Sequence, residues 1–242
     1  MKVELLAFTQ HPMEVMYCAW THRPMSDAAG YPTVTSAGEI DDLWSRWIVE
    51  PTSALEFVHL SFLLLGVSRA FLAQITRHRM LGFWVQSMRT TDMSSFKFEE
   101  PAGLDDWQTR VYVEAMDDTN QSYQRLLAAG VPLEIARDVI PLGAPTNIAV
   151  AGNLRAWAGL IRSRACLMAQ QGMWAPVLNG MKKAMVQVEP RFSELFAAPC
   201  RFTNECQYRH EQENRIAKGG TDFAAQPSLG VCPVYANKFH GK

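Results

Sequence analysis

Three adjacent basic side chains, Arg77-His78-Arg79, follow an apolar stretch that runs from Val67 to Ile75. Arginine presents a planar fork of five N–H donors and stays charged at every working pH. Phosphates and carbonyl-rich rings are the ligands that suit such donors best. Taken alone, the tripeptide is also compatible with a solvated helix end, where cations are favourable. An anion or heterocycle site therefore needs support from other residues.

Three nearby polar residues provide that support. Ser87 lies eight residues after Arg79, and Arg89 follows two residues later. Gln74 lies three residues before the tripeptide, so on a helix it would share a face with the first two basic residues. We expect a strand that ends near Leu65 to deliver this helix and to make the site rigid.

A second basic segment follows Asn153. Arg155 and Arg164 are nine residues apart, which at about 100° per residue places them on opposite sides of a helix. One helix could therefore serve two sites or two subunits. Arg137 lies at the end of a shorter predicted helix. For any one of these arginines, a surface ion pair is the competing interpretation.

The hydrophobic pattern predicts the elements that position these residues. Strands are predicted over 2–8, 55–65 and 147–151, and helices over 13–20, 39–49, 67–80, 104–129, 132–139, 153–171, 174–188 and 190–196. The strand over 55–65 is expected to be buried on both faces, and 81–95 and 199–242 to be irregular. No repeat or low-complexity linker divides the chain. We therefore predict one α/β domain of the α+β type over 1–242, with a small sheet and long helices.

The composition limits the classes of function. The chain has 242 residues, of which 48% are hydrophobic and 19% charged, and its formal net charge is -1. These values are typical of globular proteins and give no overall basic field to attract nucleic acid. The most apolar stretch, 57–75, is interrupted too often to span a membrane. The N-terminus lacks the layout of a signal peptide, so the expected location is the cytoplasm.

Five scattered cysteines are more typical of a reducing compartment than of a disulfide scaffold. Cys200, Cys206, His210 and Cys232 could in principle form a zinc site. Their spacing matches no common zinc module, and we predict no metal.

Taken together, the motifs resemble the flavin-dependent thymidylate synthases. Arg-His-Arg, seven residues and then Ser is the signature of that family, and Arg89 falls where the family has a further arginine. Other family features in the same order are an Asn-x-Arg on a late helix, an arginine eleven residues after this Asn, an Ala-Gln pair, and an arginine sixteen residues before the Asn. They are matched by Asn153-Leu154-Arg155, Arg164, Ala169-Gln170 and Arg137. The resemblance extends upstream to Ser53-Ala54-Leu55-Glu56, which is similar to a Thr-Pro-Phe-Glu stretch.

The resemblance implies a role for each matched residue. The residues expected to contact FAD are Ser53, Arg77, His78, Arg79, Asn153 and Arg155. Those expected to hold the nucleotide, its phosphate and its uracil ring are Gln74, Ser87, Arg89, Arg137 and Arg164. Arg164 and Ser87 would lie nearest the chemistry, with Ser87 as a binding residue rather than a nucleophile. The family also implies a thymidylate-synthase-complementing-protein-like fold and a homotetramer with sites shared between subunits.

The implied reaction is reductive methylation at C5 of uracil in dUMP or UMP. Methylenetetrahydrofolate supplies the carbon, NADPH reduces the flavin, and the reduced flavin delivers hydride. The protein positions the rings, and an arginine against the uracil carbonyls stabilises charge as C5 becomes nucleophilic. This scheme needs no cysteine nucleophile.

Four positions depart from the family pattern. Trp84-Val85 replaces Asn-Glu, Phe57 and Met168 replace histidines, and Gly159 replaces an asparagine. Such changes fit a specialised relative, such as the UMP C5-methylases of nucleoside-antibiotic pathways, and leave UMP, dUMP or both as substrates. Two other classes stay open: a catalytically silent nucleotide- or flavin-binding homologue, and an RNA-binding protein that stacks bases on Phe83 and Trp84.

Overall fold

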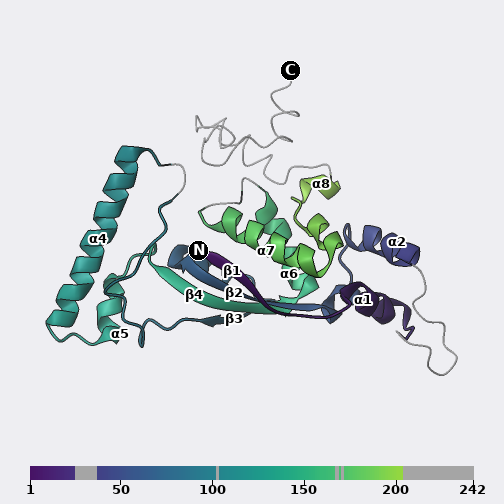
Figure 1. Cartoon of the computed structure of the whole chain (residues 1–242), viewed down its shortest axis with the longest axis horizontal. Helices are drawn as coiled ribbons and strands as arrows, with labels where there is room; N and C mark the ends of the chain where they lie inside the picture. The colour runs from purple at the N-terminus through teal and green to yellow at the C-terminus, as the bar shows by residue number, and fades with distance from the viewer. Residues whose placement is uncertain (25–36, 102–103, 167–168, 170–171, 204–242) are drawn as a thin grey trace, which may run out of the picture.

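The centre of the molecule is a four-stranded antiparallel sheet in the order β1-β2-β4-β3 (Figure 1). The computed structural model describes residues 1–24, 37–101, 104–166, 169 and 172–203. Its strands are β1 (Lys2–Phe8), β2 (His59–Ser68), β3 (Gly82–Val85) and β4 (Pro145–Asn153). The antiparallel pairing and the separate helices make this an α+β fold with a small sheet, as the sequence predicted.

Strand β2 shows why one face of the sheet is covered and the other is not. Leu60, Phe62 and Leu64 are buried, whereas the residues between them are only half-buried. Alternate side chains of a strand point to opposite faces, so one face of β2 packs against the core. The prediction that this strand is buried on both faces was wrong. Its start was also misplaced, because Ser53–Phe57 forms the 3-10 helix η1.

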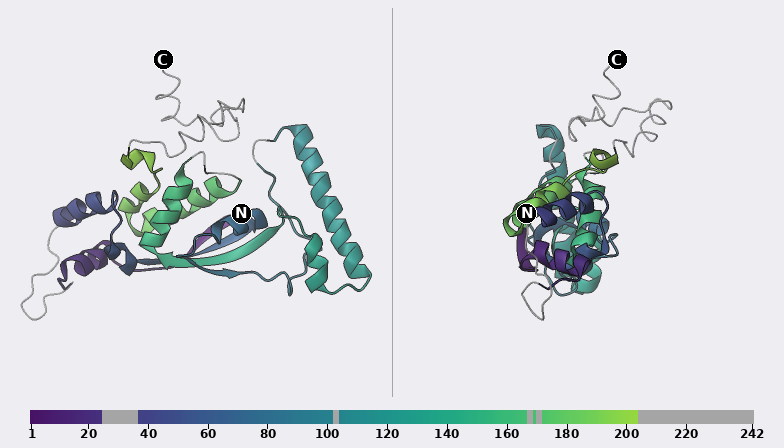
Figure 2. Two further views of the ribbon diagram at one scale, coloured as in Figure 1. Left: turned by 180° about the vertical axis from the view of Figure 1, so that it is seen from behind. Right: turned by 90° about the vertical axis from the view of Figure 1, so that its right-hand side faces the viewer.

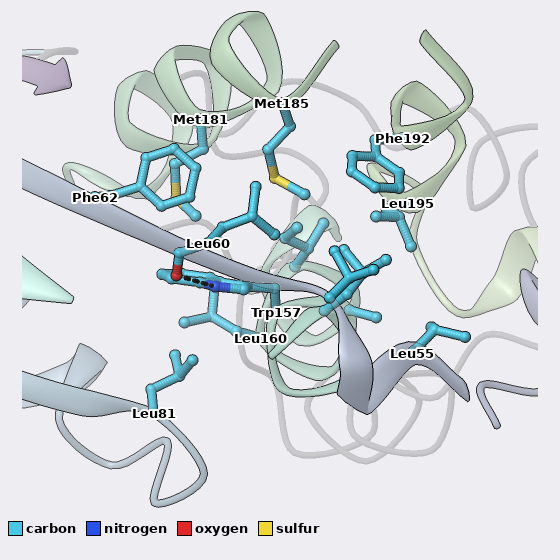
Figure 3. Packing of buried hydrophobic residues seen from close by; sticks show 14 of the residues in the cluster. Leu55, Leu60, Phe62, Leu81, Trp157, Leu160, Met181, Met185, Phe192 and Leu195 are labelled. Atoms are coloured by element: carbon cyan, nitrogen blue, oxygen red, sulfur yellow. Dashed lines mark hydrogen bonds between the residues drawn. The ribbon is translucent and has the colours of Figure 1, made fainter. Parts of the chain in front are cut away.

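Helices α6 (Leu154–Ala165) and α7 (Trp174–Val188) lie together on one side of the sheet (Figure 2). The Trp157 indole of α6 packs edge-on against Phe62 at 5.2 Å between ring centroids. Its N–H donates to the carbonyl oxygens of Leu60 at 3.2 Å and Gly152 at 3.1 Å. Figure 3 shows the first of these bonds among the side chains of β2, α7 and the 3-10 helix η4 (Pro190–Leu195). One tryptophan therefore ties α6 to two strands.

Two helices at one end of the sheet extend the main core. They are α1 (Pro12–Thr21) and α2 (Ala37–Trp47). The short helix α8 (Cys200–Thr203) follows η4, so the prediction that the chain is irregular from residue 199 was wrong at its start. The rings of Trp20 and Trp47 meet edge to face at 6.0 Å. Arg162 of α6 donates to the carbonyl oxygen of Val49 at 3.3 Å and also to that of Ile48. These contacts join the end of α2 to α6.

At the other end, α4 (Asp106–Ala128) projects from the sheet beside α5 (Leu133–Ala136) and the 3-10 helix η2 (Arg137–Val139) (Figure 1). Asp105 and Gln108 form a capping box that begins α4. A second, smaller core cluster lies here and contains Met93, Tyr123, Ala136 and Ala144. Helices α4, α5 and η2 therefore pack on this second cluster rather than on the main core, the larger cluster that includes Phe62 and Trp157.

The segment around the basic tripeptide differs from its prediction. Strand β2 continues to Ser68, and helix α3 covers only Arg69–Ile75. Gln74 is therefore helical, whereas the tripeptide lies in the turn that follows. The prediction that Gln74, Arg77 and His78 share one helix face was wrong. The predicted loop over 81–95 contains β3, and the helix predicted over 153–171 ends at Ala165.

Within the described ranges, no helix is long and apolar enough to cross a bilayer. In the same part of the chain, no group of three or more His, Cys, Asp or Glu side chains could hold a metal ion. Three residues of the alternative zinc site, Cys206, His210 and Cys232, lie outside the described residues.

Candidate active site

A hollow of about 570 Å³ lies where β4 passes into α6. We call it the main hollow. It is lined by Glu56, His78, Arg79, Met80, Leu81, Asn153, Arg155, Ala156, Gly159 and Leu160. These residues come from η1, from the turn after α3, from the end of β4 and from the first turns of α6. The structure therefore brings together four of the predicted cofactor residues from segments far apart in sequence.

Asn153 fixes the geometry of this hollow at the start of α6. It is the last residue of β4 and the N-cap of α6, and its Oδ1 accepts the backbone N–H of Ala156 at 2.9 Å. The N-terminus of a helix carries partial positive charge and favours anions. Arg79 and Arg155 add two positive charges to the same lining, and the carboxylate of Glu56, which pairs with Arg155 at 2.5 Å, offsets one of them. The hollow is thus suited to an anionic ligand that also has an apolar part, which Leu81 and Leu160 could contact.

His78 forms an inner wall of the main hollow. Burial lowers the pKa of its imidazole, and the nearby Arg164 cation lowers this pKa further. Its Nε2 is buried and has no hydrogen-bond partner in the described part of the chain. The imidazole is therefore neutral near pH 7, with one buried nitrogen available to a ligand.

Behind His78, the indole of Trp174 joins two predicted nucleotide-binding residues. Its N–H donates to Oε1 of Gln74 at 2.6 Å, and Cζ of Arg164 lies 4.5 Å from the centroid of its ring. The ring of His78 meets it edge to face at 6.2 Å. The main hollow and the Gln74–Arg164 pair are therefore neighbours. Trp174 begins α7, and the sequence patterns gave no reason to select it.

Two neighbouring arginines, Arg69 and Arg137, define a third possible binding position. Burial lowers the pKa of Arg69, at the start of α3, and the charge of Arg137 lowers it further. The Nη1 atom of Arg69 is buried without a hydrogen-bond partner among the described residues. Two adjacent cations are unfavourable unless an anion joins them. Sequence reasoning did not select Arg69, although it interrupts the apolar run over 57–75.

The other predicted residues lie near these groups but not in the main hollow. Arg89 faces Glu134 at 3.9 Å, three residues before Arg137. Ser87 is exposed after β3, and its Oγ accepts the backbone N–H of Arg89 at 3.3 Å. Arg77 is exposed in the turn after α3. Within one chain, the structure therefore does not bring all the predicted site residues together in one hollow.

Ser53 lines a second hollow of about 380 Å³, together with Ala19, Trp20, His22, Ala54 and Phe57. Of the positions that depart from the family pattern, Phe57 is therefore in the second hollow and Gly159 in the main one. Trp84 is 82% exposed, whereas its neighbour Val85 packs against the main core. Met168 and Gln170 lie outside the described residues.

Comparison with known proteins agrees with this fold. Residues 4–191 match the family of the thymidylate synthase complementing protein. A flavin-dependent thymidylate synthase of Nitratidesulfovibrio vulgaris is 28% identical over 197 residues, which cover 70% of this chain and 76% of that protein. One of Halobacterium salinarum is 29% identical over 209 residues, covering 70% of this chain and 85% of that protein.

The crystal structure of a UMP/dUMP methylase, PolB from Streptomyces cacaoi bound with 5-Br dUMP, has a similar fold, with a TM-score of 0.65. The match covers 81% of this chain and 94% of that one at 21% identity. The chain belongs to the thymidylate synthase complementing protein family. It is an enzyme, a methyltransferase similar to the flavin-dependent thymidylate synthases, and the resemblance seen in its sequence is confirmed.

Proposed function

We propose that the protein catalyses FAD-dependent reductive methylation of uracil C5 in a pyrimidine nucleotide, either dUMP, UMP or both. Methylenetetrahydrofolate and NADPH would be the co-substrates. The observation that carries the proposal is the main hollow, where Arg79, Arg155 and the start of α6 lie beside neutral His78. The names of the relatives, flavin-dependent thymidylate synthase and UMP/dUMP methylase, support it.

The residues of the main hollow fit a flavin dinucleotide. Arg79, Arg155 and the N-terminus of α6 would hold its diphosphate, because these groups donate hydrogen bonds and carry positive charge. Asn153 would add a polar contact, and the unpartnered Nε2 of His78 would bond a polar atom of the ring or chain. When bound, the flavin supplies the hydride of the reaction.

The nucleotide would lie along α3. Arg69 and Arg137 are suited to its phosphate, with Arg89 and Ser87 nearby, and Gln74 and Arg164 are suited to its uracil. Arg69 and Gln74 are five residues apart on one helix, which separates them by about 7.5 Å along the axis and about 140° around it, so a nucleotide would meet them through their long side chains. Donors of Arg164 against a uracil carbonyl oxygen would stabilise the negative charge that develops as C5 becomes nucleophilic.

We further propose that the enzyme is a homotetramer with shared sites. Ser53, Arg77 and Ser87 do not line the main hollow of their own chain. Helix α6 presents Arg155 to this hollow and Arg164 to Trp174, so one helix serves two parts of the site. Another copy could bring the outlying residues to the hollow. Light scattering of the purified protein, with the mass expected for four chains, tests this proposal.

The decisive experiment begins with the absorbance spectrum of the purified protein. We expect a flavin spectrum that changes when dUMP or UMP is added. Turnover of each nucleotide is then measured with and without methylenetetrahydrofolate and NADPH. A colourless protein that binds nucleotide without turnover would identify the silent homologue instead. Failure to convert either nucleotide in the presence of FAD and both co-substrates would overturn the proposed reaction.

A further inference from the structure

We propose that Trp174 is a positioning residue that makes the surface formed by Gln74 and Arg164 present hydrogen-bond donors to the ring of the nucleotide. Such a surface selects a pyrimidine with an oxo group at C4 over one with an amino group. This inference rests on the proposed function, because it concerns how the same nucleotide site recognises its base.

The first step concerns the orientation of the Gln74 amide. A glutamine side chain can present either its oxygen or its NH2 group to a neighbour, and the neighbour decides which. The indole N–H of Trp174 can only donate, and it meets Oε1 of Gln74 at 2.6 Å. Turning the amide over would place two donors against each other. The NH2 group of Gln74 is therefore the part left for a ligand.

The second step concerns Arg164. Its Cζ lies 4.5 Å from the centroid of the same indole, so the ring supports the guanidinium through a cation–π contact. Its Nη1 also donates to the carbonyl oxygen of Ala169 at 3.3 Å. A guanidinium has donors and no acceptor. Gln74 and Arg164 thus offer the same kind of group, and one indole contacts both.

The third step concerns the rigidity of the indole. Trp174 has no exposed surface, and the ring of Phe71 packs on it at 4.7 Å. Sδ of Met173 accepts the backbone N–H of Ser68 at 2.9 Å, which ties the residue before Trp174 to the start of α3. The indole of Trp174 is therefore held against α3, the helix that carries Gln74. An orientation held in this way is set before the nucleotide arrives.

Base selection follows from these contacts. At C4, uracil carries an acceptor oxygen and cytosine a donor amino group, whereas N3 is a donor in uracil and an acceptor in cytosine. Fixed donors that face position 4 therefore pair with uracil and are left unpaired against the cytosine amino group, which costs affinity. A glutamine that could turn over would accept the amino group and lose this discrimination.

The test measures binding of dUMP and of dCMP by titration calorimetry on the full chain with its flavin. We expect Trp174→Phe, which keeps a ring under Arg164 but removes the N–H, to lower the ratio of dUMP to dCMP affinity about tenfold. Gln74→Leu should lower the ratio similarly, and the double variant no further. The matched control is Trp44→Phe, which loses an indole bond of 3.2 Å to Glu194 elsewhere in the core and should keep the wild-type ratio.

Two outcomes would overturn this inference and leave the proposed function intact. One is a wild-type ratio in Trp174→Phe or in Gln74→Leu, and the other is an equal loss in Trp44→Phe. If Trp174→Phe does not fold, as shown by its thermal melt, a wild-type ratio in Gln74→Leu still overturns the inference. A wild-type protein that binds neither nucleotide would instead overturn the proposed function and this inference with it.

Discussion

Arg155 of α6 pairs with Glu56 of η1, which is 99 residues away in the sequence, with 2.5 Å between Nη1 and Oε1. The two side chains are 50% and 45% exposed, so water screens their attraction. Exposed pairs of this kind contribute about 0–1 kcal/mol to the free energy of unfolding. The pair therefore matters mainly because it fixes the direction of a cation at the main hollow.

Replacing Arg155 should affect flavin binding more than stability. We expect Arg155→Ala to weaken FAD binding about 10- to 100-fold, because a hydrogen bond to a charged group contributes about 1.5–3 kcal/mol. The free energy of unfolding should change by less than about 1 kcal/mol. Flavin titration and denaturant unfolding measure the two effects. Arg46→Ala, which breaks a similarly exposed pair with Asp42 on α2, should leave flavin affinity unchanged.

Arg69 offers a test of the proposed phosphate position. We expect Arg69→Met to leave the free protein as stable as wild type or slightly more stable, because it removes a desolvated cation beside Arg137. The same variant should bind dUMP about 10- to 100-fold more weakly and deoxyuridine, which has no phosphate, equally well. Calorimetric titration of both ligands gives the comparison.

The control for that variant is Arg162→Met. Burial also lowers the pKa of Arg162, but its guanidinium bonds the carbonyl oxygens of Ile48 and Val49 and stacks on Phe202. We expect this variant to lose stability and to keep the wild-type preference for dUMP over deoxyuridine. An Arg69→Met protein with the same preference would show that the phosphate lies elsewhere.

The pKa of His78 makes stability depend on pH. Its folded pKa lies below the unfolded value of about 6.5, so between the two values the unfolded chain binds more protons. The contribution of His78 to the free energy of unfolding is therefore fully present above about pH 6.5, and it is lost as the pH falls towards the folded pKa. Denaturant unfolding at pH 7.5, 6.5 and 5.5 should show a smaller pH slope in His78→Gln than in the wild type. Identical slopes would contradict this prediction.

Two glycines on the helices that cover the sheet should respond oppositely to alanine. At Gly180 of α7, an added Cβ would lie 2.7 Å from Cγ2 and 2.8 Å from Cβ of Val3 on β1. Overpacking of about 1–3 kcal/mol then outweighs the gain in helix propensity of about 1 kcal/mol. We expect Gly180→Ala to lower the melting temperature by about 2–6 °C.

At Gly159 of α6, an added Cβ would meet nothing within 4 Å. Gly159→Ala should therefore gain most of the helix propensity and raise the melting temperature by about 2–4 °C. Differential scanning calorimetry of both variants gives the comparison. An increase in the melting temperature of both variants would mean that β1 and α7 can move apart at no cost in stability.

Local patterns were sufficient for two elements. The periodicity predicted β1 over Lys2–Phe8 and α7 over Trp174–Val188 with the bounds that the structure shows. The two elements depend on neighbours in sequence, which is the information that periodicity contains. The family resemblance selected His78 and Arg155 as cofactor residues, and both line the main hollow.

Long-range pairing decided the rest. The sequence could not show that β2 continues to Ser68, because this strand end is set by its register with Pro145 on β4. Strand β4 also pairs with β3, whose four residues are too few for a periodic signal. The indole bond between Trp174 and Gln74 joins residues 100 apart. The sequence determined which residue types are available, and the packing of α3, α6 and α7 decided which of them meet, because their contacts form only when distant segments share one core.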